Sequence, residues 1–370
     1  MNRRGFIAGA FMAAAPYPLV SAEKAVPTSS GATADGGRGI LRLNPPEQVL
    51  PMLQNMRMRA IRTDRRFHPV PQQAQLTLLH FSDIHNDVAN LRRVMEFYRH
   101  YRRFFDDALL TGDIAGGSWR DWSEEMMTVD GFRGVLKTIG NHDNLRWNGT
   151  KTDANARQCY DRYFDGIASW GVVQPDDSNP SGLCYWYKDY PKCGIRLVGL
   201  DCMHYDRAQN TWFSAVLETA REKGLAVLAA QHYPPMNKRN TTGLPNCPFD
   251  SLQRESLNSE LPQAVAAVDA FQKAGGEFIC WLGGHTHADF CGTVNGRRQM
   301  FITVGIARNS EIWGDMRRVA GEKSQDLFNV VSVDVCRKHI RVMRVGAEWS
   351  RFMQRRCAMC LDYDNRCQIA

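Results

Sequence analysis

The residues of this chain best suited to chemistry are aspartates, an asparagine and histidines, grouped in five short motifs. In chain order the motifs are Asp83-Ile84-His85, Gly112-Asp113, Gly140-Asn141-His142-Asp143, His232 and Gly284-His285-Thr286-His287. Carboxylate, amide oxygen and neutral imidazole together suit divalent metals such as Mn, Fe, Zn or Co. The motifs supply more candidate ligands than one ion takes. They favour two ions that share a bridging carboxylate and lie about 3.5–4 Å apart.

Each motif comes directly after a short apolar run. The runs cover residues 76–81, 108–111, 135–139, 226–230 and 278–282. Runs of this length and composition predict strands that are buried on both faces. Open α/β sheets bind their ligands at the carboxyl ends of such strands. We therefore expect motifs that are far apart in the sequence to meet at one site.

Taken singly, each motif has a commoner structural explanation. An Asp-x-His after a strand is usually a capping or loop pair, and Gly-Asp is a frequent turn. Two histidines spaced as His285 and His287 point the same way on an extended segment, which is rarer by chance. The occurrence of all five motifs, each at a predicted strand end, favours a metal site.

The five motifs in this order resemble the signature of the calcineurin-like metallophosphoesterase superfamily, over roughly residues 76–345. The resemblance assigns three side chains to a first metal, namely Asp83, His85 and His287. It assigns three others to a second metal, namely Asn141, His232 and His285. Asp113 would bridge the two ions. His142 would lie near the leaving-group oxygen without binding a metal, and Asp143 would orient it.

The same resemblance implies the fold class and the reaction. The expected fold is α/β, with two mixed β-sheets packed face to face and flanked by helices in a four-layer sandwich. The expected activity is hydrolysis of a small anionic phosphate ester (a phosphodiester, a nucleotide or a monoester) by hydroxide activated at two divalent metals. A tyrosinate-to-iron site of the purple acid phosphatase type is disfavoured, because Gly116 stands where those enzymes carry tyrosine.

Two alternatives to this activity remain open. One is a nucleotide pyrophosphohydrolase or nuclease that uses the same metals. The other is a non-catalytic scaffold that retains a metal site, against which the intact ligand set and His142 argue. The formal net charge of +7 agrees with an anionic substrate, but a generally basic surface explains it as well. No large basic groove is evident, so we predict no stable nucleic-acid partner; the oligomeric state is left open.

The N-terminus predicts export. Asn2-Arg3-Arg4-Gly5-Phe6-Ile7 resembles a twin-arginine motif, an apolar stretch runs to Val20, and Val20-Ser21-Ala22 is a plausible cleavage site. The alternative is an ordinary secretory signal. Either way we expect a periplasmic or secreted protein, and the apolar stretch is too short for a good membrane span. No other run is long enough, so we expect no span in the mature chain.

The rest of the chain divides into an extension, a catalytic domain and a tail. We predict a signal at 1–22, a linker and N-terminal extension at 23–72, the metallophosphoesterase domain at 73–346 and a Cys-rich tail at 347–370. Helices are expected near residues 47–62, 91–98, 211–223 and 262–274. Further strands are expected at 196–200, 300–304, 327–335 and 340–345.

Cysteines and aromatic residues give weaker predictions. The chain has 11 cysteines, an odd number, so internal disulfides would leave at least one thiol unpaired. Cys280 lies in a predicted core strand and is expected to be a buried thiol. Cys357, Cys360 and Cys367 favour disulfides in the tail over a zinc site. The aromatic-rich insertion at 144–190 suggests either core packing or a wall that stacks on a base.

Overall fold

The computed structural model describes residues 39–62, 75–116, 123–143, 161–164, 166–175, 184–203, 205–235, 261–294, 298–309, 318–347 and 358–368. All of them belong to the compact unit Asp35–Ala370. The predicted signal, the linker up to residue 38 and residues 63–74 lie outside the described part of the chain. Their assignment stays a prediction.

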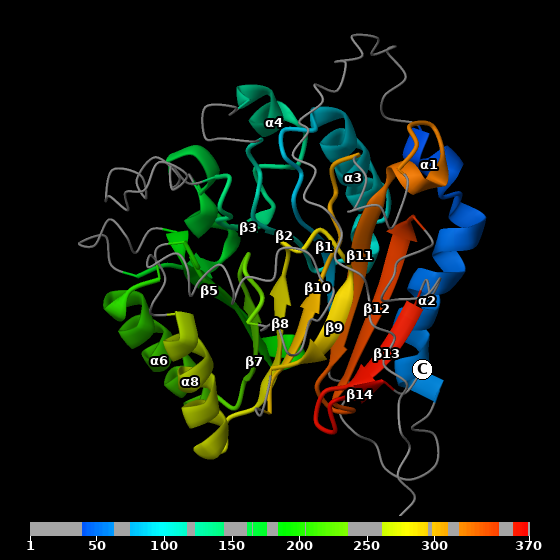
Figure 1. Ribbon diagram of the computed structural model, residues 1–370. Helices are drawn as coiled ribbons and strands as arrows, with labels where there is room; N and C mark the ends of the chain where they lie inside the picture. The colour runs from blue at the N-terminus through cyan, green and yellow to red at the C-terminus, as the bar shows by residue number, and fades with distance from the viewer. Residues whose placement is uncertain are drawn as a thin grey trace, which may run out of the picture. The chain divides into compact units, whose positions relative to one another are not determined.

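Two mixed sheets carry the fold (Figure 1). The first has the strand order β14-β13-β12-β11-β1-β2-β3, and the second has the order β4-β5-β6-β7-β8-β10-β9. The strands of the first sheet are β1 (Leu76–Phe81), β2 (Asp107–Thr111), β3 (Leu136–Thr138), β11 (Leu327–Asp334), β12 (His339–Gly346), β13 (Ala358–Asp362) and β14 (Cys367–Gln368). Those of the second are β4 (Val172–Val173), β5 (Trp186–Tyr190), β6 (Ile195–Gly199), β7 (Ala226–Ala230), β8 (Phe278–Gly283), β9 (Phe290–Thr293) and β10 (Met300–Thr303).

The strands that precede the motifs are parallel within each sheet. β1, β2 and β3 run parallel to one another, and so do β6, β7, β8 and β10. Every residue of β1, β2, β3, β7 and β8 is buried. This matches the near-continuous apolar sequence of the runs and confirms the predicted strands at each motif. Because parallel strands end at the same edge, the motifs of one sheet lie together.

Helices flank the two sheets, which confirms the predicted α/β sandwich. They are α1 (Gly39–Leu43), α2 (Pro46–Arg62), α3 (Val88–His100), α4 (Glu124–Thr128), α6 (Arg207–Glu222) and α8 (Leu261–Lys273). Short 3-10 turns cover Arg102–Phe104, Ile167–Trp170, Pro191–Cys193 and Lys323–Gln325. In Figure 1, α6 and α8 lie side by side next to β7, and they contact β7 and β8 respectively.

The helices of the first sheet are anchored through both side chains and backbone. Phe97 of α3 packs edge-on against Phe328 of β11, with ring centroids 4.9 Å apart. Arg341 of β12 donates to the carbonyl of Met56 in α2 at 2.8 Å. Helix α6 begins at Arg207, four residues before the predicted start, because the side chain of Asp206 caps it by accepting from the N–H of Gln209.

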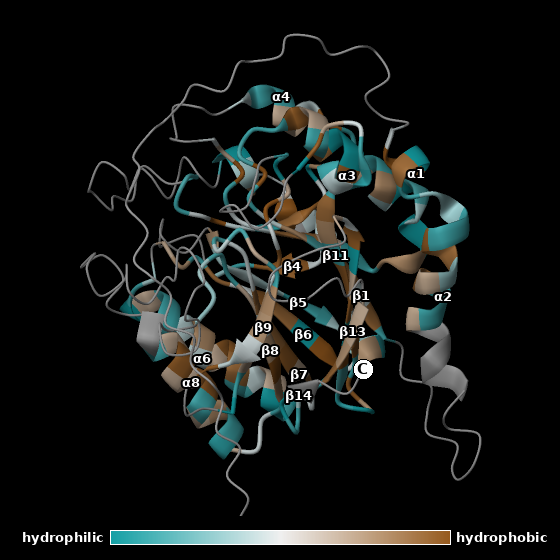
Figure 2. Ribbon diagram, turned by 45° about the vertical axis from the view of Figure 1, so that its right-hand side comes forward, coloured by the Kyte–Doolittle hydropathy of each residue, from teal (hydrophilic) through white to brown (hydrophobic). Residues whose placement is uncertain are grey.

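The two sheets share one hydrophobic core. Figure 2 shows the strands in brown, the apolar end of the scale, while teal residues lie along the helices. Trp186 of β5 is fully buried, and its indole N–H donates to the carbonyl of Lys137 in β3 at 2.8 Å. This bond joins a strand of one sheet to a strand of the other and fixes their relative position at that edge.

Part of the predicted tail belongs to the first sheet, where β13 and β14 extend β12. Cys280 is fully buried and free, as predicted, and Cys360 is also a free thiol. Cys357 lies outside the described residues, so a disulfide in the tail stays a prediction.

Most described aromatic residues of the 144–190 insertion are core residues. Tyr163, Phe164, Tyr185 and Trp186 are each 2% exposed or less. Trp147 lies outside the described part. Packing therefore accounts for these four, and they offer no wall for a substrate base.

Among the described residues, no helix has both the length and the apolar character needed to cross a membrane.

Lys137 is a fully buried cation in β3. Its ammonium donates to the carbonyls of Phe132, Arg133 and Val135 at 2.9, 3.2 and 2.7 Å. Burial lowers the pKa of Lys137 from 10.5 to about 7, and the nearby Arg133 cation adds to the shift. The unfolded chain therefore binds this proton more tightly than the folded protein does. The group costs stability as the pH falls from about 10 to 7, and the full cost is present below pH 7.

We predict that Lys137→Met removes this pH dependence. The free energy of unfolding of the variant, minus that of the wild type, should rise as the pH falls from about 10 to 7, by at most ~1.4 kcal/mol per pH unit. Below pH 7 the difference should level off. Urea unfolding between pH 6 and 10 measures it. A difference that is the same at every pH would show that Lys137 does not titrate differently in the two states.

Candidate metal centre

Loops from both sheets form one site. Asp83 and His85 follow β1, Asp113 follows β2, and the Asn141-His142-Asp143 segment follows β3. His232 follows β7, and the His285-Thr286-His287 segment follows β8. All nine predicted site residues lie in the described part of the chain. The structure brings the seven candidate metal ligands together at the carboxyl ends of these strands.

The backbone of these loops is strained. Five of the seven candidate ligands have a positive φ, namely Asp83 (56°), His85 (45°), Asp113 (54°), His285 (65°) and His287 (55°). This left-handed region is uncommon for residues other than glycine and costs on the order of 1–3 kcal/mol per residue. Such strain persists only where the surroundings impose it, and it concentrates at functional sites.

The glycines of the motifs permit a close approach between loops. A Cβ on Gly140 would collide with the backbone and carboxylate of Asp113, and one on Gly284 would collide with Ser82 and Asp83. Gly112 has a φ of 87°, and a Cβ there would lie 2.6 Å from Nδ1 of His232. The sequence showed these glycines as parts of motifs. The structure gives the reason, since each lets one ligand-bearing loop rest directly on another.

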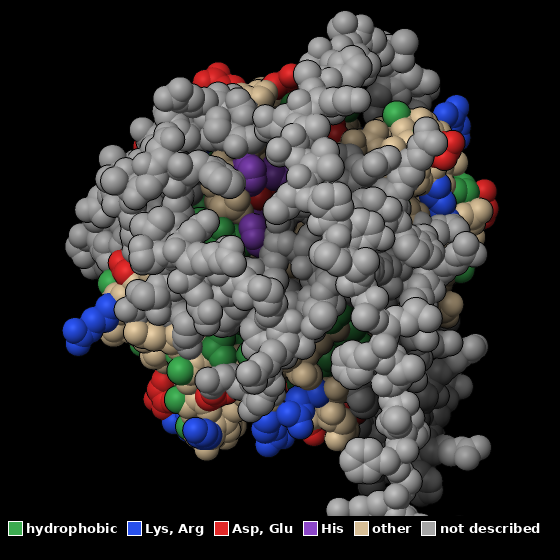
Figure 3. Space-filling model, viewed as in Figure 1, with side chains coloured by type: hydrophobic (Ala, Val, Ile, Leu, Met, Phe, Trp, Pro, Cys, Tyr) green, Lys and Arg blue, Asp and Glu red, His purple; other side chains and the backbone are tan. Residues whose placement is uncertain are grey.

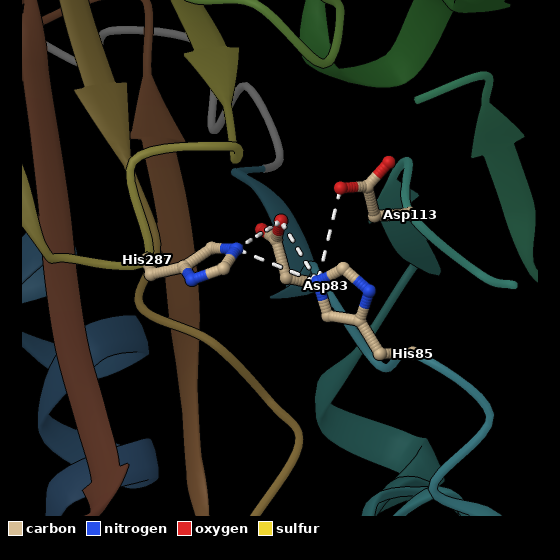
Figure 4. A group of neighbouring side chains, drawn as sticks. All are labelled: Asp83, His85, Asp113 and His287. Carbon is tan, nitrogen blue, oxygen red and sulfur yellow. Dashed lines mark hydrogen bonds and ion pairs between the residues drawn. The ribbon is translucent and has the colours of Figure 1, made fainter. Parts of the chain in front are cut away.

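The first group of candidate ligands is Asp83, His85, Asp113 and His287. Figure 4 shows their polar ends directed toward one another, from loops of both sheets. Asp83 Oδ1 lies 3.3 Å from Nε2 of His287 and 3.8 Å from Nε2 of His85. Asp113 Oδ2 lies 3.8 Å from the same His85 nitrogen, and the two histidine Nε2 atoms are 3.4 Å apart.

The second group is Asp113, His232 and His285, and Asn141 lies beside it. Nε2 of His232 lies 3.3 Å from Asp113 Oδ2 and 3.0 Å from Asn141 Oδ1. The other ring nitrogen, Nδ1, lies 2.7 Å from the carbonyl of Thr111. A carbonyl can only accept, so Nδ1 carries the proton and Nε2 is left to face the site.

The residues present fit divalent metal ions. Asp113 belongs to both groups, as a bridging ligand must. Asp83 Oδ1 is buried and has no hydrogen-bond partner, although it faces two histidine nitrogens. A buried carboxylate oxygen without a donor is costly. A cation between these groups would satisfy the oxygen and the histidine nitrogens together.

The electrostatics of the site divide the histidines. Burial lowers the pKa of His85 to about 4, and burial together with His232 lowers that of His285 to about 3, so both are neutral and can use a lone pair. Burial also acts to lower the pKa of His232, but Asp113 outweighs it and raises the value to about 9. Burial opposes ionisation of Asp113, yet His232 holds its pKa well below the usual range. Metal binding must therefore displace the proton of His232.

His142 lies at the edge of both groups. Its backbone N–H donates to Asp113 Oδ1 at 2.9 Å, and its Nδ1 lies 2.9 Å from the carbonyl of Gly116. The second ring nitrogen, Nε2, is 3.9 Å from Asp113 Oδ2. The ring is thus fixed by the loop after β2, with Nε2 turned toward the shared carboxylate.

Asp143 binds backbone N–H groups of two loops. Its Oδ1 accepts from Ile114 and Ala115 at 2.7 and 2.8 Å, and its Oδ2 accepts from Gly140 at 2.9 Å. Burial, followed by the Asp113 charge, raises the pKa of Asp143 to about 7, against the effect of these donors. The carboxylate therefore ties the loop after β2 to the loop after β3.

Two site side chains are more accessible than the rest. The side chains of His142 and His287 are each 21% exposed, whereas His85 is 6% exposed and Asp83, Asp113 and His232 are 1% or less. Figure 3 shows histidine side chains in purple at a recess of the face in view, with an acidic side chain behind them. A substrate would therefore meet the site on the side of His142 and His287.

Sequence reasoning missed two residues that support the ligands. The carbonyl of Thr111 fixes the tautomer of His232, and the ring of Tyr233 packs on His285 with centroids 4.3 Å apart. Tyr233 directly follows a motif residue, which is a weak signal. The contribution of Thr111 comes from its backbone, which no side-chain pattern reveals.

Solved structures share this fold at low sequence identity. A dimetal phosphatase from Danio rerio is 12% identical, with a TM-score of 0.50, and the match covers 78% of this chain and 99% of that one. The GAP50 anchor of the inner membrane complex of Plasmodium is 11% identical over 74% and 84% of the two chains, with a TM-score of 0.40. An archaeal phosphodiesterase is 12% identical over 73% and 100%, with a TM-score of 0.29. No curated protein is significantly similar in sequence.

A family model settles the membership. The model described as calcineurin-like phosphoesterase matches residues 76–289, which is more than half of the chain and includes all five motifs. The matched region begins at β1 and ends just after the His285-Thr286-His287 segment. The chain belongs to the calcineurin-like phosphoesterase family.

Proposed function

We propose that this protein is a phosphoesterase that uses two divalent metal ions to hydrolyse small-molecule phosphate esters. One observation carries the proposal, namely that the buried carboxylate of Asp113 belongs to two groups of candidate ligands at once. Asp83, His85, Asp113 and His287 would hold one ion. Asp113, Asn141, His232 and His285 would hold the other.

The metals and the protein have separate tasks. Two bound divalent ions would polarise a phosphoryl oxygen and lower the pKa of a bound water. The protein holds the ligands in place before any metal arrives, through the bond from His232 to Thr111 and the packing of Tyr233 on His285. Such preorganisation lowers the cost of stabilising the charge that develops on the phosphoryl group.

His142 is the proposed proton donor to the leaving oxygen. Its Nδ1 is engaged with Gly116, so Nε2 is the atom that would give up the proton. Nε2 lies beside the shared carboxylate of Asp113, and the side chain is among the more accessible of the site. This position suits a group that touches the substrate without binding a metal.

Asp143 is proposed to orient His142 through the backbone. Its carboxylate holds the N–H groups of Ile114 and Ala115, and the next residue, Gly116, supplies the carbonyl that fixes the His142 ring. The sequence resemblance implies an orienting role for Asp143. The geometry suggests that the role is exerted through this loop.

The substrate is proposed to be a small phosphate ester outside the cytoplasm. The support for this location is the twin-arginine-like motif Arg3-Arg4 and the apolar stretch after it. Export would separate the enzyme from cytoplasmic phosphoproteins. The net charge of +7 favours capture of anions without selecting one.

A hydrolysis panel tests the proposal. The full chain would be freed of metal, reloaded with Mn, Zn or Fe, and assayed on monoesters, diesters, pyrophosphates and a phosphopeptide. We predict hydrolysis of a small mono- or diester that a chelator abolishes and added metal restores. Cleavage of pyrophosphates alone would establish the alternative reaction. No hydrolysis by protein with two bound ions would establish a scaffold, and faster cleavage of the phosphopeptide would refute the small-molecule claim.

We predict that Asp113→Asn releases both ions more readily than Asn141→Ala releases either. Asp113 would contact both ions and supplies the negative charge between them, whereas Asn141 would contact one ion through a neutral oxygen. Elemental analysis after stepwise dialysis against a chelator compares the two variants with the wild type. Equal retention in both variants would mean that Asp113 does not bridge.

We predict that His142→Ala keeps both metals and loses turnover by about 10²–10⁴-fold, as expected for a general acid. Substrates whose leaving group has a low pKa should partly rescue the variant, because they need no proton from the enzyme. His100→Ala, at an exposed histidine of α3, serves as the matched control and should keep full activity. Loss of metal together with loss of turnover would instead make His142 a ligand.

A further inference from the structure

The segment that carries His285 and His287 ends at a buried carboxylate, Asp289. Its side chain is 1% exposed, and Oδ1 accepts from the backbone N–H of Gly305 at 2.8 Å and from Nδ2 of Asn329 at 3.1 Å. Its other oxygen forms an ion pair with Arg344, whose side chain is also 1% exposed. The resemblance and the motifs assign no role to these residues.

The partners of Asp289 come from both sheets. Gly305 follows β10 of the second sheet, while Asn329 lies in β11 and Arg344 in β12 of the first. Asn329 and Arg344 stand directly opposite each other in the β11–β12 register, so they present their side chains on the same face. The region that matches the family model ends at Asp289, and both first-sheet partners lie beyond it.

Stability alone does not explain this ion pair. Both charges are removed from water, and their mutual attraction only offsets the cost of desolvation when further hydrogen bonds are made. A pair of apolar side chains of similar volume is often as stable or more stable. A buried ion pair of this kind is better understood by what it positions.

The neighbouring segment needs to be held. His285 and His287 have φ values of 65° and 55°, and such strain relaxes unless contacts on both sides prevent it. At one end the N–H of His285 donates to Asp83 Oδ2 at 3.0 Å. At the other end the carbonyl of Ala288 accepts from Thr303 Oγ1 at 2.7 Å, and Asp289 makes the contacts described above.

We propose that the Asp289–Arg344 ion pair is the positioning device that keeps His285 and His287 in their metal-binding conformation. The β11–β12 hairpin is then a working part of the metal centre, since it supplies both Asn329 and Arg344. The inference rests on the proposed function, because it takes the two histidines to be metal ligands. Residues that support metal ligands typically contribute about 10–100-fold to metal affinity.

The test compares Arg344→Met with the wild type, both prepared without metal. Calorimetric titration with Mn²⁺ measures affinity, and hydrogen exchange followed by mass spectrometry measures protection at residues 284–289 and at Gly305. We expect Arg344→Met to bind Mn²⁺ about 10–100-fold more weakly, with faster exchange confined to those residues. Arg344→Lys should recover part of the affinity because it restores the cation.

The matched control is Arg341→Met, on the same strand. Arg341 donates to Met56 on the opposite face of β12, away from Asp289. This variant should bind Mn²⁺ like the wild type. If Arg344→Met does not fold, Asp289→Asn takes its place, because the amide keeps an oxygen for Gly305 and removes only the charge.

The outcomes separate this inference from the proposed function. Wild-type protein that binds no Mn²⁺ would refute the proposed metal centre itself. Wild-type protein that binds two ions, with Arg344→Met or Asp289→Asn binding them within threefold of the wild type, would refute the positioning role. Faster exchange across the whole β11–β12 hairpin, with unchanged Mn²⁺ affinity, would assign the ion pair to the stability of the fold alone.

Discussion

The carboxylate of Asp113 is the point on which the site depends. It lies at the end of β2 and faces histidines from both sheets, with His232 at 3.3 Å and His85 at 3.8 Å. It also accepts from the backbone of His142, so the loop after β3 is built around it. A charge buried in this way is tolerable only if cations or donors surround it. The same requirement that makes it costly in the empty fold makes it a suitable ligand for two ions.

The fold meets this requirement by spending local strain on a rigid frame. Strands that are buried on both faces end at a common edge, and the loops that follow adopt left-handed backbone at five ligands. Gly140 and Gly284 let those loops touch without a Cβ between them. Buried polar contacts then hold the loops, with Asp143 joining the ends of β2 and β3 and Asp289 joining the two sheets.

The parts of this architecture that depend on local pattern could be predicted from sequence. The apolar runs before Asp83, Asp113 and His232 are strands, and the motifs converge where strand ends must. β5 escaped prediction because Lys188 and Asp189 interrupt its apolar character, and β13 because it lies in a segment interpreted as a tail. The pairing of Asp289 with Arg344 joins residues far apart in the chain, and a lone arginine in a strand carries no signal of its partner.

The most direct test of this account is anomalous diffraction from crystals soaked with Mn²⁺ or Zn²⁺. The account predicts two peaks, one on each side of the Asp113 carboxylate, about 3.5–4 Å apart. One peak should lie among Asp83, His85 and His287, and the other among Asn141, His232 and His285. A single peak that Asp113 does not touch, or peaks elsewhere while these side chains stay unmetallated, would contradict it.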